Sequence, residues 1–282
     1  MADVELAPLV ALARAAGRAI LDVAEHARGA ATMKSMEQGP VTEADLVADR
    51  VVREGLAALF PDDTIVTEET WRADREVTAT GRVWFVDPLD GTREFVEGRD
   101  EYSVMIGLVD DGVPRIGVVH QPSTGVTWAG DARRGVAFRI DDDDTWRARD
   151  IRSATPGARL RVAVSRSHSS EVARAISDAL DADVVLHGSV GLKAALLVDD
   201  VVDAYVSGSR RIKMWDTAGP SAIVAAAGGA FTALDGTPLQ YVGPPAHGAG
   251  VRALSPAADD ARARIDALVA ARNRPGGQSP DE

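Results

Sequence analysis

Residues 83–95, VWFVDPLDGTREF, place four apolar residues directly before Asp87, with a second aspartate, Asp90, three positions later. An apolar run of this length that ends in turn-forming residues is typical of a buried strand. The strand would therefore deliver carboxylates to the edge of a hydrophobic core, where an unpaired carboxylate is costly. Since the chain already has a net charge of -12, these carboxylates require a compensating partner.

Ordinary turn and capping chemistry offers a second interpretation of the acidic residues. Proline and glycine favour turns, so residues 87–92 could simply form one. Asp45 lies three residues after a threonine, as in a helix capping box, and Asp216 could cap the helix that follows it. Glu68 could be a solvated loop acid. Burial of the apolar run before Asp87 favours a functional role at that position.

Apolar spacing and turn signals divide the chain into helices and short strands. Helices are expected at residues 5–27, 42–60, about 169–180, 190–199, 217–228 and 261–273. Strands are expected at residues 64–67, 83–86, 102–109, 115–120, 125–130, 135–139, 160–165, 183–188 and 202–206. Tight-turn signals separate the strands between residues 102 and 139, which indicates an antiparallel meander.

The charged segment 140–158 lacks periodicity and contains Pro-Gly, which is typical of a surface connection between lobes. We therefore predict an N-terminal α+β lobe at residues 1–150 that carries most of the acidic motifs. A C-terminal α/β lobe is expected at residues 151–282, where strands alternate with helices. Residues 274–282 are expected to be a frayed tail.

The charge balance and composition exclude several classes of partner. The chain has 43 acidic and 31 basic residues and a pI near 4.9, so no nucleic-acid polymer is expected to bind. Acidic residues stand where a signal peptide needs basic ones, and no apolar run approaches the roughly 20 residues that span a bilayer. A cytoplasmic location without a membrane partner is therefore expected. The absence of cysteine excludes disulfides, thiolate metal sites and a cysteine nucleophile.

Acidic residues recur at predicted strand ends and helix starts, at residues 68–69, Asp87, Asp90 and Asp216. Two unit charges about 4 Å apart repel by roughly 4 kcal/mol at an effective dielectric near 20, so converging carboxylates need a cation. Hard oxygen ligands favour magnesium or calcium, and magnesium is the better candidate where phosphate is the substrate. Two such ions could activate a water molecule and stabilise the leaving oxygen.

The spacing of the aspartates disfavours a covalent aspartyl mechanism. Haloacid-dehalogenase-type phosphatases use Asp-x-Asp-Gly-Thr after an apolar strand, whereas Asp87 and Asp90 are three positions apart. Side chains on a strand alternate with a period of two, so the second carboxylate would point in a different direction. Metal-activated water is therefore the favoured nucleophile.

Four motifs, GPVTEAD (39–45), TEE (67–69), DPLDGTREF (87–95) and WDTAGPSAIVAAAGG (215–229), resemble those of the inositol monophosphatase superfamily. These enzymes are magnesium-dependent, lithium-sensitive phosphatases, and the match extends over nearly the whole chain. The resemblance implies an α/β layered sandwich of alternating αβαβα layers with the active site between two lobes. It also implies two or three Mg²⁺ ions, a small phosphorylated nucleotide or sugar substrate, and a possible homodimer.

The same resemblance implies roles for individual residues. The metal ligands would be Glu68, Asp87, Asp90, Asp216 and the backbone carbonyl of Leu89. Asp45, Glu68 and Thr92 would orient or deprotonate the attacking water. Gly91 and Thr92 would offer backbone N–H groups to the phosphate.

Three segments resemble the 3′(2′),5′-bisphosphate nucleotidase branch, which removes the 3′-phosphate from 3′-phosphoadenosine 5′-phosphate. They are REF (93–95), VSRSHSS (164–170) and GSVGLK (188–193). The resemblance implies substrate contacts by Arg93, His168, Ser189 and Lys193. His168 could instead be a surface histidine, and Ser189 a helix cap.

The chain departs from this branch at two places. Glu37 stands where some members have an aspartate, and it could supply an acid for a third metal ion. Bacterial relatives often have an arginine soon after the strand that ends near residue 206, whereas here residues 206–209 come before Arg210 and Arg211, so the resemblance does not assign the contact with the 5′-phosphate. Either Arg210 or Lys213 replaces that arginine, or the substrate is a different nucleotide or sugar phosphate. The three lysines of the chain all lie near motifs, as a second substrate phosphate would require.

The sequence therefore predicts a magnesium-dependent phosphomonoesterase, with a bisphosphate nucleotidase as the first choice. Hydrolysis of inositol-1-phosphate, histidinol phosphate or another sugar or nucleotide monophosphate is the alternative within the same chemistry. A non-catalytic sensor of phosphorylated ligands or metal is the alternative of another class. The presence of every expected catalytic position argues against the sensor.

Overall fold

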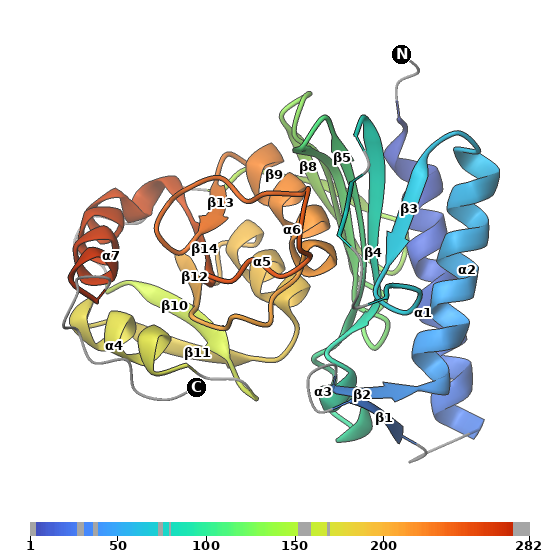
Figure 1. The fold of residues 1–282 in the computed structure, drawn as a ribbon, viewed down its shortest axis with the longest axis horizontal. Coiled ribbons are helices and arrows are strands. Elements are labelled where there is room, and N and C mark those ends of the chain that lie inside the picture. The colour runs from blue at the N-terminus through green and yellow to red at the C-terminus, as the bar shows by residue number, and fades with distance from the viewer. Residues whose placement is uncertain are drawn as a thin grey trace.

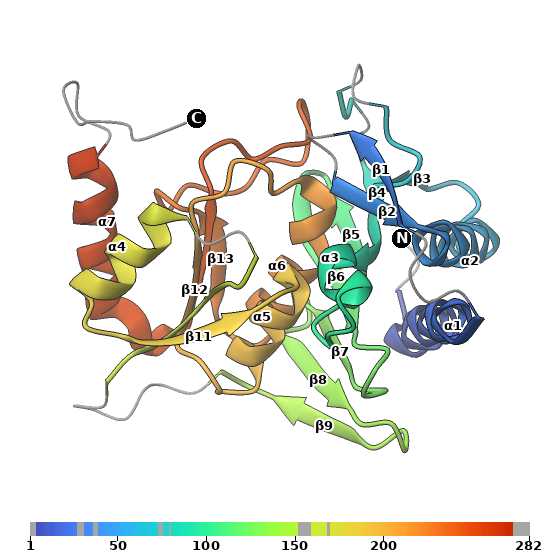
Figure 2. The same cartoon turned by 90° about the horizontal axis from the view of Figure 1, so that it is seen from below.

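The computed structural model describes residues 4–26, 31–35, 39–72, 76–78, 80–151, 159–167 and 170–272. The elements form five layers (Figures 1 and 2). In order these are helices α1 (Leu6–His26) and α2 (Glu43–Leu59), a seven-stranded sheet, helices α5 (Val190–Val198) and α6 (Met214–Ala226), a five-stranded sheet, and helices α4 (Glu171–Ala179) and α7 (Asp259–Arg272). The expected αβαβα sandwich is confirmed.

The outer helices α1 and α2 pack on the seven-stranded sheet because each carries an apolar stripe. Leu9, Ala13 and Ile20 of α1 are fully buried, at the spacing that places them on one helical face. Thr42 is the N-cap of α2, and its hydroxyl oxygen accepts a hydrogen bond from the Ala44 N–H at 3.1 Å. Both helices lie where the apolar spacing predicts them.

The seven-stranded sheet has the order β3-β4-β5-β6-β7-β8-β9. Its strands are β3 (Thr64–Thr67), β4 (Arg82–Asp90), β5 (Ser103–Asp110), β6 (Val113–His120), β7 (Thr127–Asp131), β8 (Val136–Ile140) and β9 (Trp146–Arg149). Strands β3 and β4 are parallel, and each later neighbouring pair is antiparallel, which confirms the predicted meander. Because β3 and β4 are parallel, their C-terminal ends meet at one edge of the sheet.

Strand β9 lies inside segment 140–158, for which the sequence predicts a surface connection between lobes. The strand at residues 146–149 was not predicted. The Arg147 guanidinium pairs with Asp141 at 2.8 Å, and that of Arg149 pairs with Asp199 at 2.8 Å. Ladder hydrogen bonds to β8 and these ion pairs stabilise a strand that has little apolar content.

Helix α6 lies in the middle layer and approaches the seven-stranded sheet closely. A Cβ atom at Gly117 of β6 would lie 2.0 Å from the carbonyl oxygen of Gly219 in α6. One at Gly107 of β5 would lie 2.3 Å from the Gly219 nitrogen. The absence of side chains at these three positions therefore allows backbone-to-backbone contact between helix and sheet.

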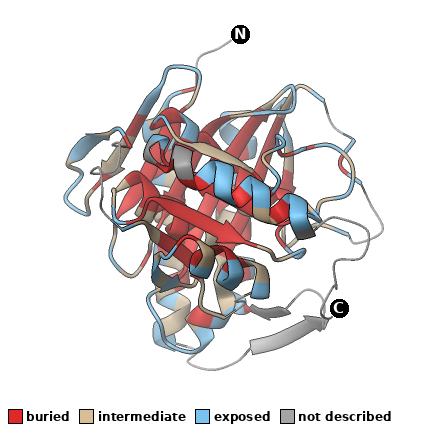
Figure 3. Cartoon of the chain, turned by 90° about the vertical axis from the view of Figure 1, so that its left-hand side faces the viewer, coloured by how far each residue is buried: buried red, intermediate tan, exposed pale blue. Residues whose placement is uncertain are grey.

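The five-stranded sheet has the order β11-β10-β12-β14-β13. Its strands are β10 (Arg161–Ser165), β11 (Asp183–His187), β12 (Ala204–Ser207), β13 (Ala230–Ala233) and β14 (Val251–Leu254). The first three are parallel, as the alternation of strands and helices predicts, while β14 is antiparallel to both β12 and β13. Helices α4 and α7 cover the outer face of this sheet, with buried strands beneath exposed helical surface (Figure 3).

Several elements differ from the sequence-based expectation. Strands β13 and β14, the hairpin of β1 (Ala31–Ser35) with β2 (Gly39–Thr42), the short helix α3 (Thr92–Val96) and the 3-10 turn η1 (Pro256–Ala258) were not predicted. Helix α6 begins at Met214 instead of residue 217, because the Lys213 N–H donates to the Asp216 carboxylate at 2.8 Å and closes the first turn. The expected tail at 274–282 lies outside the described residues.

None of the described helices combines the length and the hydrophobicity needed to cross a membrane. The lobe boundary near residue 150 and the possible homodimer stay predictions.

Candidate active site

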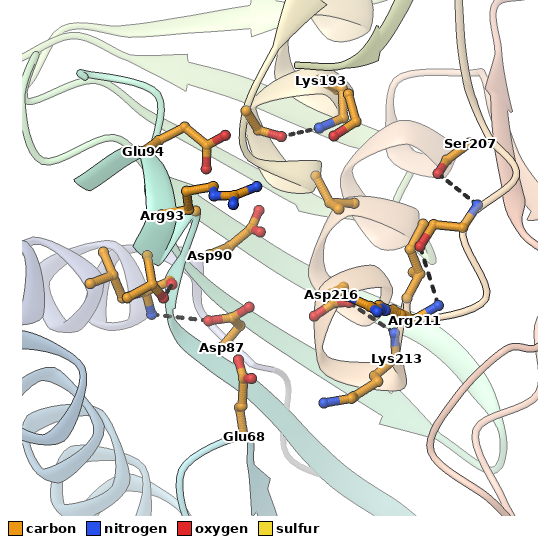
Figure 4. Close-up of a pocket in the computed structure, with 18 of the residues that line it drawn as sticks. Glu68, Asp87, Asp90, Arg93, Glu94, Lys193, Ser207, Arg211, Lys213 and Asp216 are labelled. Atoms are coloured by element: carbon orange, nitrogen blue, oxygen red, sulfur yellow. Dashed lines mark hydrogen bonds between the residues drawn. The ribbon is translucent and has the colours of Figure 1, made fainter. Parts of the chain in front are cut away.

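A cavity of about 530 Å³ lies between the two sheets and is lined by residues from both halves of the chain (Figure 4). Its walls come from the ends of β3 and β4, from α3, from the start of α5 and from the loop between β12 and α6. The five metal ligands that the resemblance implies all line it, namely Glu68, Asp87, Leu89, Asp90 and Asp216. The fold therefore brings together residues that are far apart in the sequence.

Glu68, Asp87 and Asp90 approach one another because of the pairing of β3 with β4. Glu68 directly follows β3, and its N–H donates to the Val86 carbonyl of β4 at 3.1 Å. The register of β4 against β5 shifts between Asp87 and Asp90, so β4 is irregular there. The Leu89 N–H donates to Asp87 Oδ1 at 3.0 Å across this irregularity. The unusual three-residue spacing of the aspartates is thus accommodated by a bulge.

The carboxylates destabilise one another's charged forms. Burial, followed by repulsion from Glu68, Asp90 and Asp216, raises the pKa of Asp87 well above its ordinary value. Burial and repulsion from Glu68 and Asp90 likewise raise the pKa of Asp216. No group of three or more His, Cys, Asp or Glu side chains within the described ranges already has the arrangement of a metal site. The hard oxygen donors nevertheless fit a divalent cation, which would relieve this repulsion.

Asp45 and Thr92 form a hydrogen-bonded pair at the cavity. Asp45 is 3% exposed, and its Oδ2 accepts from the N–H and the hydroxyl of Thr42, both at 2.7 Å. Its Oδ1 lies 3.0 Å from the Thr92 hydroxyl, which is also 3.0 Å from the Leu89 carbonyl oxygen. One oxygen of the Asp45 carboxylate therefore completes the capping box, and the other contacts Thr92.

Gly91 joins β4 to α3 in the left-handed region, with φ of 95°. A Cβ atom at this position would lie 2.8 Å from the Glu101 carbonyl oxygen. Glycine is therefore required by the backbone itself. The contact of the Gly91 and Thr92 amides with a phosphate stays a prediction.

Ser189 has a different environment from the one that a substrate contact requires. It is 1% exposed and is the N-cap of α5, with its hydroxyl oxygen accepting from the Leu192 N–H at 3.0 Å. The Ser189 hydroxyl lies 2.5 Å from Asp90 Oδ2, which also accepts from the Gly191 N–H at 3.0 Å. This geometry favours positioning of Asp90 over direct contact with substrate.

Lys193 lines the cavity, but its ammonium group already has protein partners. It is 1% exposed, and Nζ donates to the carbonyl oxygens of Gly188, of Ser189 at 2.8 Å and of His187 at 3.4 Å. Burial lowers the pKa of Lys193 to about 8, against the opposite effect of nearby carboxylates. Lys193 therefore holds the turn before α5 in place, and its contact with substrate stays a prediction.

The remaining predicted contacts are placed as follows. Arg93 lines the cavity with its side chain 51% exposed, and its Nε lies 3.8 Å from Glu97 Oε1. Lys213 also lines the cavity, whereas the Arg210 side chain donates to the Gly248 carbonyl at 3.1 Å. Within the described residues, Arg210 is therefore not part of the cavity lining. His168 and Glu37 lie outside the described residues.

Glu94 is a cavity residue to which the sequence reasoning gave no role. It is 4% exposed and accepts a hydrogen bond from the Ser167 hydroxyl, which comes from the loop after β10. Arg166 of the same loop forms a bidentate ion pair with Glu101, at 2.8 and 2.6 Å. These contacts join α3 and the residues just before β5 to the loop after β10 of the five-stranded sheet, at the rim of the cavity. The position of Glu94 inside the REF motif is the sequence signal that points to it.

Solved structures of inositol monophosphatases share this fold. Inositol monophosphatase II from Staphylococcus aureus MSSA476 matches with a TM-score of 0.73 and 21% identity, covering 94% of this chain and 96% of its own. The inositol monophosphatase of Anabaena (Nostoc) sp. PCC 7120 matches with a TM-score of 0.72 and 23% identity, covering 94% of each chain. At these identities the likeness shows the fold.

The family model and the curated relatives that the chain matches show a phosphatase of the hydrolase class, which the layered fold and its acidic cavity fit. The inositol monophosphatase family model matches residues 2–269, and the chain belongs to this family. The 3′(2′),5′-bisphosphate nucleotidase CysQ of Escherichia coli (strain K12) is 33% identical over 234 residues, 82% of this chain and 91% of that protein. The 3′-phosphoadenosine 5′-phosphate phosphatase of Mycobacterium leprae (strain TN) is 34% identical over 231 residues, 82% and 81%. The family implies a divalent metal, generally Mg²⁺.

Proposed function

We propose that the chain is a magnesium-dependent 3′(2′),5′-bisphosphate nucleotidase that removes the 3′-phosphate of 3′-phosphoadenosine 5′-phosphate. The observation that carries the proposal is the convergence of four carboxylates and a threonine on one cavity: Glu68, Asp87, Asp90, Asp216 and Thr92. The two relatives named for this activity support the choice of substrate. The four carboxylates and the Leu89 carbonyl oxygen would hold two or three Mg²⁺ ions.

Bound divalent ions supply Lewis acidity, which lowers the pKa of a water molecule and stabilises the departing ester oxygen. The chain's own residues would direct the proton. With the Thr92 hydrogen donated to Asp45 Oδ1, a lone pair of the Thr92 oxygen is left to accept a hydrogen bond from the attacking water. The water oxygen would bond to phosphorus as the phosphorus–ribose oxygen bond breaks, one water proton would pass by way of Thr92 to Asp45, and the departing ribose oxygen would take up a proton from solvent. No covalent enzyme intermediate is required.

The test is phosphate release from a panel of substrates, with and without Mg²⁺ and with added Li⁺. The panel contains 3′-phosphoadenosine 5′-phosphate, inositol-1-phosphate and histidinol phosphate. We expect turnover that depends on Mg²⁺, is inhibited by Li⁺ and is highest for the bisphosphate nucleotide. A preference of about a hundredfold for inositol-1-phosphate, nearly 3 kcal/mol in transition-state stabilisation, would reverse the choice of substrate.

Asp90→Asn addresses the alternative of a non-catalytic sensor. Because the substitution removes one charge from the carboxylate group, we expect turnover to fall by more than about 100-fold. Asp62→Asn makes the same chemical change at an exposed position before β3 and should leave turnover within about twofold. Tight ligand binding by the wild-type protein without any turnover would instead support a sensor.

A further inference from the structure

Asp90 is held by the rest of the protein through one of its two carboxylate oxygens. Oδ2 accepts a hydrogen bond from the Ser189 hydroxyl at 2.5 Å and another from the Gly191 N–H at 3.0 Å. Within the described part of the chain no hydrogen bond reaches Oδ1, and Asp90 lines the cavity. One oxygen is therefore bound by the start of α5, and the other is available to a ligand in the cavity.

The direction of the hydrogen bonds around Ser189 follows from its single hydroxyl hydrogen. The bond to the Asp90 carboxylate uses that hydrogen. The Ser189 oxygen accepts from the Leu192 N–H at 3.0 Å and lies 2.8 Å from Ser103 Oγ. Since Ser189 has no second hydrogen, Ser103 is the donor in that contact. The hydrogen bonds therefore run in one direction, from Ser103 through Ser189 to Asp90.

Ser103 is the first residue of β5 and the cross-strand partner of Asp90 in β4. It is fully buried, and among the described residues it does not belong to the cavity lining. A Cβ atom at Gly191 would lie 2.9 Å from Ser103 Oγ, so glycine allows the first turn of α5 to approach β5 this closely. Ser103 can therefore influence the cavity only through Ser189.

Capping of α5 does not by itself account for this arrangement. An N-cap needs only an acceptor oxygen, which Ser189 offers to the Leu192 N–H. The hydrogens that Ser103 and Ser189 donate are not needed for the cap. Asp90 lies among carboxylates that repel it, so its side chain would turn away from them unless fixed donors held it. Groups that hydrogen-bond to a metal-ligating carboxylate fix its orientation in this way.

We infer that Ser103 is a positioning residue of the metal site. Through Ser189 it holds Oδ2 of Asp90 against the start of α5, which leaves Oδ1 to the metal ions. This role rests on the proposed function, because Asp90 acts as a metal ligand only there. Hydrogen bonds in a chain strengthen one another, so loss of the Ser103 hydroxyl would weaken the hold of Ser189 on Asp90.

Mg²⁺ binding to the metal-free protein, measured by isothermal titration calorimetry without substrate, tests this role. We expect Ser103→Ala to raise the Kd for Mg²⁺ by about 3- to 10-fold and Ser189→Ala to raise it by about 10- to 100-fold. Ser103→Thr retains the hydroxyl and should bind Mg²⁺ more tightly than Ser103→Ala. Ser177→Ala is the matched control, because this buried serine donates to the Ala173 carbonyl within α4, and it should leave the Kd within about twofold.

The double variant Ser103→Ala/Ser189→Ala distinguishes an effect through Ser189 from a general effect on packing. If Ser103 acts through Ser189, the double variant should bind Mg²⁺ as weakly as Ser189→Ala alone. Losses of affinity that simply add would overturn the inference. In steady-state phosphate release, Ser103→Ala should need more Mg²⁺ for half-maximal rate, while kcat at saturating Mg²⁺ stays within about threefold of wild type.

The role of Ser103 and the proposed function fail in different ways. If the wild type binds Mg²⁺ and hydrolyses the bisphosphate but Ser103→Ala binds Mg²⁺ equally well, the role of Ser103 is overturned and the nucleotidase stands. A wild-type protein that binds no Mg²⁺ overturns the proposed metal site and the role of Ser103 together. Thermal unfolding in chelator shows whether each variant is folded, and Ser103→Cys, a weak donor of similar shape, replaces Ser103→Ala if the latter is not.

Discussion

Asp45 shows how a single residue can serve structure and chemistry at once. One carboxylate oxygen accepts the Thr42 hydrogen bonds that begin α2, and the other faces the Thr92 hydroxyl. A substitution at Asp45 would therefore mix loss of a helix cap, worth about 1 kcal/mol, with loss of a proton acceptor. Thr92 offers the cleaner test of the chemistry.

Thr92→Val should remove the proton route with little change in side-chain volume. Because the hydroxyl would connect the attacking water to Asp45, we expect kcat to fall by roughly 100- to 10,000-fold. Thr92→Ser retains the hydroxyl and should keep most of the activity. Steady-state phosphate release by the two variants is the measurement, and equal activity of the valine and serine variants would contradict the proton route.

At the scale of secondary structure, the contact between α6 and the strands β5 and β6 depends on the missing side chain at Gly117. A methyl group there would meet the Gly219 carbonyl oxygen at 2.0 Å, and neither backbone can move without disturbing its own hydrogen bonds. Gly117→Ala should therefore lower the free energy of unfolding by at least about 2 kcal/mol.

The measurement is the urea midpoint of unfolding. Val113→Ile on the same strand is the control, because it adds a methylene at a side chain that is 65% exposed and should change stability by less than about 0.5 kcal/mol. A Gly117→Ala variant as stable as this control would show that helix and sheet can separate freely.

Elements with strong local patterns could be predicted, and elements defined by distant partners could not. Helices α1 and α2 have apolar stripes, and the meander from β5 to β8 has tight-turn signals between its strands. Strand β9 carries Trp146 and alternating arginines. It forms because it pairs with β8 and because Arg149 forms an ion pair with Asp199. The start of α6 depends on the side chain of Asp216, which caps the first turn. Apolar spacing alone does not detect this cap, so it placed the start of the helix three residues too late.

The same distinction holds for the site. The acidic motifs predicted which carboxylates line the cavity, because strand ends and helix starts are visible in the sequence. The position of Ser189 was harder to predict, since its partner Asp90 is 99 residues away and belongs to the seven-stranded sheet, whereas Ser189 caps a helix of the middle layer. Residues that link the two layers, such as Arg166 and Glu101, carry no local signal of their partnership.

For the molecule as a whole, the carboxylate cluster that would bind the metal ions also lowers the stability of the metal-free protein. The raised pKa of Asp87 means that the unfolded chain releases this proton at lower pH than the folded protein does. As pH rises above the ordinary pKa of a carboxyl group, the free energy of unfolding of the metal-free protein therefore falls. The decrease continues until the pH passes the raised pKa of the folded state. A bound divalent cation would reverse the sign of this contribution.

Asp87→Asn should consequently stabilise the metal-free protein at neutral pH, by roughly 1–3 kcal/mol, while lowering activity. The gain should shrink as pH falls towards the ordinary carboxylate range, because asparagine does not titrate. Added Mg²⁺ should raise the melting temperature of wild type more than that of the variant. Thermal unfolding across pH, with chelator or Mg²⁺, is the measurement, and a variant less stable than wild type in chelator would contradict mutual repulsion.

Helix α6 lies between the two sheets, touches one of them through bare backbone and presents Asp216 from its first turn. Natural selection for turnover and natural selection for a foldable chain therefore act on the same short stretch of sequence. A substitution in α6 must therefore preserve both the close contact with the sheet and the position of Asp216. We expect its sequence to diverge less freely than the sequences of the outer helices.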